Sequence, residues 1–147
     1  MMPLIKNDAT GSELDFNQII HHFDLLRYIF GDVESVFAYT RNTRPSAISC
    51  MDVCTAVLKF KSGLVGTLDA TTNCVPMNER TELVVVSDKG LFTTVPKGTL
   101  HMHQIKHVMD SIEKGEDPEV KPEDATETLK LALAVHQSAW SGKEIHL

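Results

Sequence analysis

The chain has 147 residues, of which 42% are apolar and 23% are charged, and its formal net charge is -6. This length and composition predict one ordinary globular domain with a hydrophobic core. The negative charge argues against nucleic-acid partners, no apolar run is long enough to cross a membrane, and the first residues lack the apolar core of a secretion signal, so we expect a cytoplasmic protein.

The first predicted element is a capped helix. Residues 1–14 contain breakers of regular structure and are expected to form a lead-in segment. Asp15 is a good N-cap and Gly31 is a good stop, so a helix is predicted over residues 15–31. Its apolar side chains recur at helical spacing and are expected to form a buried face: Ile19, Phe23, Leu26 and Phe30.

A neighbouring face of the same helix carries four polar groups at the same spacing. These groups are an amide, an imidazole, a carboxylate and a phenol, contributed by Asn17, His21, Asp24 and Tyr28. Residues at such offsets lie above one another on successive turns. The stripe is therefore a candidate site for a polar ligand.

The middle of the chain is typical of antiparallel strands joined by short turns. The evidence is a run of β-branched and aromatic residues followed by a clean alternation of apolar and polar residues. Five strands are predicted from these patterns, over residues 33–42, 52–61, 64–73, 81–86 and 91–95. Tight turns at Ser62–Gly63 and Asp88–Gly90 favour a meander within one sheet.

The last third of the chain is predicted to be helical. One helix is expected over residues 100–114, and a second begins at Pro122 and ends before Gly142. The buried stripe of this second helix is expected to consist of Ala125, Leu129, Ala132, Leu133, His136 and Trp140. Residues 143–147 are expected to add a closing strand to a sheet of five or six strands.

Together these elements predict an α+β domain over residues 15–147. Its open, mainly antiparallel sheet is expected to have helices packed on one face. The other face mixes threonines, valines and lysines, which is typical of a surface that pairs with another subunit. We therefore expect that face to be available for dimerisation.

Several sites are absent from the sequence or weakly indicated. No glycine-rich dinucleotide-binding motif follows a strand, so no cofactor site is predicted in this chain. Three cysteines without zinc-like spacing are expected to be reduced thiols: Cys50, Cys54 and Cys74. His103 and His107 lie one turn apart, with His101 and Asp110 nearby, but a solvated helix face is favoured over a metal site.

Four runs of the chain resemble, in order and spacing, the C-terminal domain of the Gfo/Idh/MocA oxidoreductases. The runs are NQIIHHFDLLRYIFGDVESVFA, AVLKFKSGLVGTLDATTN, ELVVVSDKGLF and EDATETLKLALAVHQSAWSGKEIHL. The resemblance implies an open antiparallel sheet, helices on one face and dimerisation through the sheet. It also implies that full-length relatives carry a preceding Rossmann domain, bind NAD or NADP there, and act on a sugar, inositol or related polyol.

The family motif on the first helix, D-x-G-x-H-x-x-D, implies roles for the polar stripe. His21 matches the motif histidine, generally the acid/base, and Asp24 matches the last acid. Asn17 stands in place of the first Asp, and Ile19 replaces the Gly, which narrows the pocket. The family's Glu-Lys-Pro signature lies in the absent domain; Lys121 here follows Val120 and is interpreted as part of a helix start.

Each site residue also has a structural interpretation. His21 is either a proton acceptor for a ligand hydroxyl or a buried, hydrogen-bonded histidine. Asp24 either orients His21 or binds a hydroxyl, or it simply pairs with Arg27 across the helix. Asn17 either contacts the ligand or caps the helix. Trp140 is expected to be core in preference to a stacking platform for sugar.

Two functions are consistent with these observations. The first is a stand-alone substrate-binding and dimerisation domain, related to NAD(P)-dependent sugar or polyol oxidoreductases and not redox-active by itself. The second is a fragment or subunit of an active dehydrogenase whose separate Rossmann domain is supplied elsewhere. The doubled Met1 and Met2 favour the expectation of a native start and hence the first function.

Overall fold

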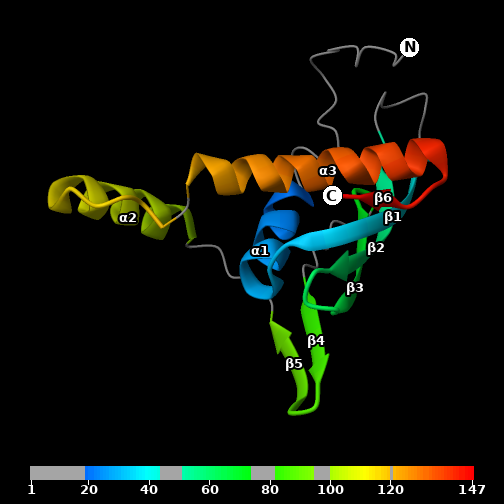
Figure 1. Cartoon of the computed structure of the whole chain (residues 1–147), viewed down its shortest axis with the longest axis horizontal. Helices are drawn as coiled ribbons and strands as arrows, with labels where there is room; N and C mark the ends of the chain where they lie inside the picture. Colours follow the sequence, from blue (N-terminus) through cyan, green and yellow to red (C-terminus); the bar gives the residue numbers. More distant parts are fainter. Residues whose placement is uncertain (1–18, 44–50, 74–81, 95–99, 120) are drawn as a thin grey trace. The chain divides into compact units, whose positions relative to one another are not determined.

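The computed structural model describes residues 19–43, 51–73, 82–94, 100–119 and 121–147 (Figure 1). The chain divides into two compact units: one comprises Met1–Asn73 with Pro122–Leu147, and the other comprises Cys74–Lys121. The predicted lead-in and the predicted N-cap Asp15 lie outside the described residues. None of the described helices is long and apolar enough to span a membrane.

The first unit contains two helices and a four-stranded antiparallel sheet in the order β3-β2-β1-β6. Its elements are α1 (Ile20–Phe30), β1 (Val33–Arg41), β2 (Val53–Phe60), β3 (Val65–Thr71), α3 (Pro122–Ser141) and β6 (Ile145–His146). The predicted strands 33–42, 52–61 and 64–73 are confirmed, as is the closing strand near the C-terminus. Gly63 has φ +87°, a backbone conformation that a tight turn requires and that glycine adopts without strain.

The alternation of β2 determines which face of the sheet is covered. Cys54, Ala56, Leu58 and Phe60 are buried, whereas the residues between them are half-buried or exposed. α1 and α3 pack over the buried face (Figure 1). Phe23 of α1 and Leu131 of α3 are both fully buried. Phe30 meets Phe60 edge to face, with ring centroids 5.7 Å apart. In this unit the expectation that helices cover one face is confirmed.

β1 contains a bulge near its start. Val33 pairs with Phe60 and Ser35 pairs with Lys59, so Glu34 is an extra residue in this strand. The shift in register lets Val33 and Val36, which are three residues apart, both pair with residues of the buried face of β2, namely Phe60 and Leu58. Beyond β6, the edge of β1 is paired by a side chain: Ser138 Oγ accepts a hydrogen bond from Ala38 N (2.9 Å) and donates one to Lys143 O (2.6 Å).

The predicted buried stripe of α3 is confirmed at Ala132, whereas His136 is half-buried and the other four predicted residues are exposed. The side chains that are buried are Thr128, Leu131, Ala132, Ala134, Val135 and Ser138. Trp140 is 82% exposed, and Leu129 and Leu133 are 44% and 45% exposed. The side chain of Thr128 hydrogen bonds to α1, and that of Ser138 hydrogen bonds to β1. These two polar residues therefore belong to the packed face of α3 and set its rotation about the helix axis.

The second unit contains a hairpin and a helix. β4 (Leu83–Ser87) pairs only with β5 (Gly90–Thr94) among the described strands, and α2 spans Leu100–Lys114. The predicted elements are confirmed, but the single sheet of five or six strands is wrong, because the described strands form separate four-stranded and two-stranded sheets. The hairpin forms through its own short turn, a local interaction that requires no other strand.

Candidate functional site

The polar stripe of α1 lies on an exposed face of the helix. Phe23 faces the core and is fully buried, whereas His21, Asp24 and Tyr28 are exposed. Offsets of three and seven residues keep these three side chains on one side of a helix. The structure therefore brings three of the four predicted site residues together, and the fourth, Asn17, lies outside the described residues.

The exposure of His21 contradicts one of its two interpretations. A buried, hydrogen-bonded histidine is wrong, because the side chain is exposed. The neighbouring His22 is half-buried and lies off the stripe. An exposed imidazole can accept a hydrogen bond from a bound hydroxyl group or exchange a proton with it.

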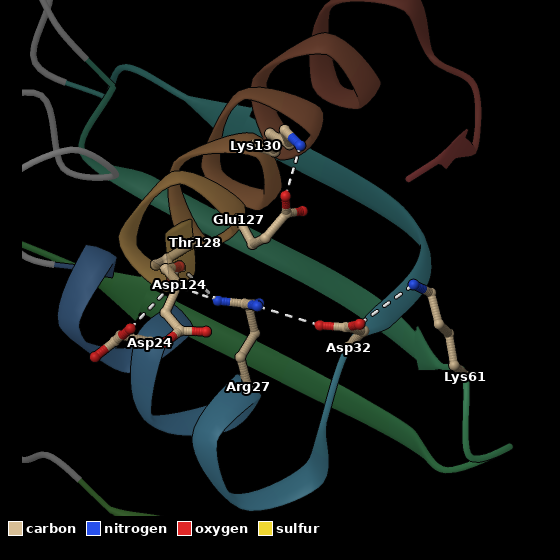
Figure 2. A network of polar contacts seen from close by, with 8 residues as sticks. All are labelled: Asp24, Arg27, Asp32, Lys61, Asp124, Glu127, Thr128 and Lys130. Atoms are coloured by element: carbon tan, nitrogen blue, oxygen red, sulfur yellow. Dashed lines mark hydrogen bonds and ion pairs between the residues drawn. The ribbon is translucent and has the colours of Figure 1, made fainter. Parts of the chain in front are cut away.

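Asp24 is held by α3 and does not pair directly with Arg27. Thr128 Oγ1 donates a hydrogen bond to Asp24 Oδ1 over 3.0 Å, and Arg27 Nη1 donates to Thr128 Oγ1 over 2.9 Å (Figure 2). Arg27 Nη1 also donates to Asp124 O, at 2.8 Å. The hydroxyl of Thr128 thus stands between the carboxylate and the guanidinium, and the direct pairing of Asp24 with Arg27 is replaced by a bridge.

The same arginine continues the network towards the sheet. Arg27 Nη2 lies 3.1 Å from Asp32 Oδ1, and Lys61 Nζ lies 3.3 Å from Asp32 Oδ2 (Figure 2). Hydrogen bonds from Arg27 and then Lys61 lower the pKa of Asp32 below its ordinary value. Only 11% of the Arg27 side chain is exposed. The network therefore joins α1, α3, the start of β1 and the β2–β3 turn.

Sequence reasoning missed Thr128. It is only 3% exposed and lies on the packed face of α3, at helical spacing from Leu131 and Val135. This spacing is a signal that was present in the sequence. A hydroxyl at a buried helical position indicates a hydrogen-bond partner on a neighbouring element.

A second polar residue that sequence reasoning missed is Asp52, whose side chain is fully buried. Its carboxylate accepts hydrogen bonds from Thr43 N (2.7 Å), Thr43 Oγ1 (2.7 Å) and Asn73 Nδ2 (2.8 Å). These bonds join the end of β1, the start of β2 and the end of β3. Because both carboxylate oxygens accept hydrogen bonds from these strand ends, we interpret Asp52 as a structural residue that holds the strand ends together.

The described part of α2 gives no support to a metal site. His107 Nε2 accepts a hydrogen bond from Glu119 N at 3.0 Å, which occupies a nitrogen that a metal would need. Asp110 is paired with Lys106 at 2.6 Å. Among the described residues there is no group of three metal-binding side chains; the side chains of His101 and His103 are not described.

A protein-family model matches more than half of the sequence of this chain. The model described as the GFO/IDH/MocA C-terminal domain matches residues 5–93. The myo-inositol 2-dehydrogenase of Thermotoga maritima is 27% identical over 157 aligned residues, which cover 87% of this chain and 47% of the dehydrogenase.

Solved structures show the same fold. The WlbA dehydrogenase of Bordetella pertussis, solved with NADH and UDP-GlcNAcA, has a TM-score of 0.80 and 26% identity over 93% of this chain and 46% of its own. A myo-inositol dehydrogenase of Corynebacterium glutamicum has a TM-score of 0.81 and 16% identity over 95% of this chain and 50% of its own. The chain thus spans about half the length of the relatives that it matches. This chain belongs to the GFO/IDH/MocA family and corresponds to its C-terminal domain.

Proposed function

We propose that this chain is a substrate-binding and dimerisation domain that binds a small sugar or polyol and does not transfer hydride by itself. It is related to NAD-dependent sugar and polyol oxidoreductases and covers only their C-terminal part. The observation that carries the proposal is the joint exposure of His21 and Asp24 on one face of α1, with Asp24 hydrogen bonded from α3. A fixed carboxylate beside an imidazole suits a ligand with several hydroxyl groups.

The two side chains have different parts in this binding. His21 accepts a hydrogen bond from a ligand hydroxyl, and as a general base it could also accept the proton of that hydroxyl. Asp24 uses Oδ1 for Thr128, and its Oδ2 makes no hydrogen bond to a residue that the structure describes, so Oδ2 accepts from a second hydroxyl. Tyr28, 71% exposed, lies one turn further along the face and offers a ring surface and a hydroxyl.

The described residues do not fit a nicotinamide dinucleotide. A dinucleotide needs a glycine-rich turn that leads from a strand into a helix N-terminus. The described glycines with positive φ lie instead at helix ends or strand turns: Gly31, Gly63, Gly90, Gly115 and Gly142. We therefore propose that NAD or NADP, which would accept the hydride, is bound by a separate Rossmann domain.

A second candidate function follows from the coverage of the relatives. The chain spans only 46–50% of the length of the two dehydrogenases whose structures are named above. The alternative is a subunit or fragment of an active NAD(P)-dependent dehydrogenase whose Rossmann domain is supplied elsewhere. NAD-dependent oxidation of a polyol by a complex of this chain with a separate Rossmann-domain protein would favour this alternative.

Calorimetric titration tests the proposed ligand binding. The purified chain is titrated with NADH, with NADPH, and with myo-inositol followed by a panel of sugars and polyols. We expect binding of at least one polyol, loss of that binding in His21→Ala, and no heat from either cofactor. The matched control is His22→Ala, the adjacent imidazole that lies off the stripe, which should retain the polyol signal. Equal loss in both variants would contradict the proposed site.

Dimerisation is proposed through the sheet face that α1 and α3 leave uncovered. On this face Phe37 pairs across to Val57, and Tyr39 meets Phe37 edge to face at 5.1 Å. Tyr39, Val57 and Val65 are 68%, 45% and 63% exposed. Apolar side chains on a regular, uncovered sheet are the composition expected of a homodimer interface.

A charge placed in this face tests the dimer. Val57→Lys puts an ammonium group on the central strand β2, and we expect sedimentation to show a monomer, because an unpaired charge in an apolar interface is costly. The matched control is Leu133→Lys on α3, since Leu133 is also 45% exposed but lies on the helical side. Dimers in both variants, or monomers in both, would contradict dimerisation through the sheet.

A further inference from the structure

We propose that Thr128 is a positioning residue, which fixes the orientation of the Asp24 carboxylate at the ligand-binding face of α1. This inference rests on the proposed polyol binding, because it concerns the same face. Thr128 belongs to α3, far along the chain from the polar stripe, and nothing in the motif on α1 identifies it. The evidence is the hydrogen-bond geometry around its hydroxyl group (Figure 2).

The direction of the Thr128 hydroxyl follows from donors and acceptors. Arg27 can only donate, so Thr128 Oγ1 must accept at 2.9 Å, and its single proton has two possible targets. These are Asp24 Oδ1 at 3.0 Å and Asp124 O at 3.2 Å. Asp124 O already accepts from Arg27, and an ionised carboxylate is the stronger acceptor. The proton therefore points to Asp24.

Burial makes this hydrogen bond a rigid support. Thr128 is 3% exposed and follows the same packed face of α3 as Leu131 and Val135, both fully buried. A β-branched side chain in a helix has few χ1 rotamers, and here two neighbours select among them. Asp24 itself is exposed and would otherwise change rotamer freely. The packed helix thus orders a side chain that solvent alone would leave mobile.

The expected consequence is a loss of affinity when the hydroxyl is removed. Thr128→Val keeps the shape of the side chain and removes the hydrogen bond, whereas Thr128→Ser keeps the hydroxyl. Immobilising one freed side chain on binding corresponds to a loss of affinity of about three- to tenfold. We expect this loss in Thr128→Val and its rescue in Thr128→Ser.

Two measurements test the proposal, and one of them needs no ligand. The χ1 rotamer of Asp24 is measured by three-bond NMR couplings in the wild type and both Thr128 variants, and affinity is measured by calorimetry with myo-inositol. We expect one dominant Asp24 rotamer in the wild type and in Thr128→Ser, and averaged couplings in Thr128→Val. A purely structural role of Thr128 would lower stability without averaging the couplings.

The outcomes for the two proposals can be distinguished. If the wild type binds no myo-inositol and no other polyol, the proposed function fails, and the Asp24 rotamer alone decides the role of Thr128. Identical Asp24 couplings in all three proteins would overturn the positioning role. It would also be overturned if Thr128→Val bound as tightly as the wild type while His21→Ala did not bind.

Discussion

Ser138→Ala should destabilise the first unit by about 2 kcal/mol, because it leaves one buried amide without an acceptor. Ser138 is fully buried, and its Oγ is the acceptor for Ala38 N at 2.9 Å. Ala38 is 1% exposed, so water does not replace the lost bond, and an orphaned donor of this kind costs about 1–3 kcal/mol. The carbonyl of Lys143 also loses a bond, but this exposed residue regains one from water.

The free energy of unfolding is measured by urea denaturation, and the exchange of the Ala38 amide is followed by NMR. The matched control is Ser141→Ala on the same helix, whose hydroxyl is exposed and lies 3.5 Å from Ser138 O, so its loss should cost less than about 0.5 kcal/mol. Faster exchange at Ala38 in Ser138→Ala alone is expected. The reasoning is refuted if the two variants have equal stability or if Ala38 keeps its protection.

Three further predictions concern single side chains. Asp32→Asn should be less stable than the wild type at neutral pH, because the ion pairs hold the pKa of Asp32 in the folded protein below its ordinary value of 3.8. Urea denaturation should show the difference in stability between the two proteins closing only as pH falls below that value, and a difference that stays constant would contradict the ion pairs. Asp52→Asn should cost about 1–3 kcal/mol in urea denaturation, because an amide donor then faces other donors; an unchanged midpoint would contradict this. Trp140→Ala should change the free energy of unfolding by less than about 0.5 kcal/mol, because Trp140 is exposed. Leu131→Ala should lower it by about 2–5 kcal/mol, because Leu131 is fully buried. Similar losses in the two variants would contradict the observed orientation of α3.

Local patterns in the sequence were sufficient to predict most elements. Alternation along residues 53–60 predicts that Cys54 and Leu58 are buried, because a strand turns successive side chains to opposite faces whatever its partners are. The helix over residues 100–114 is likewise confirmed, since helical periodicity is a local property. The separation of the β4–β5 hairpin from the main sheet was not predicted, because strand association depends on contacts distant in sequence.

The orientation of α3 and the support of the candidate site depend on distant partners. Thr128 and Ser138 are polar, and a count of apolar side chains places them on the solvent face. They are buried because their partners lie 104 and 100 residues away, on α1 and β1. By contrast, the position of His21 and Asp24 on one face follows from helix geometry within one segment, so it was predicted, whereas the exposure of that face was not.

The pairing of β6 with β1 has a consequence for how this domain is synthesised. Ser35 on β1 pairs with His146, and its hydroxyl bonds to Glu144, which lies 109 residues later in the chain. Until that segment leaves the ribosome, the nascent domain exposes an unpaired strand edge, a template for association with another chain. A chain ended at Gly142 would carry this open edge permanently, so we expect it to aggregate even though every helix of the first unit is intact.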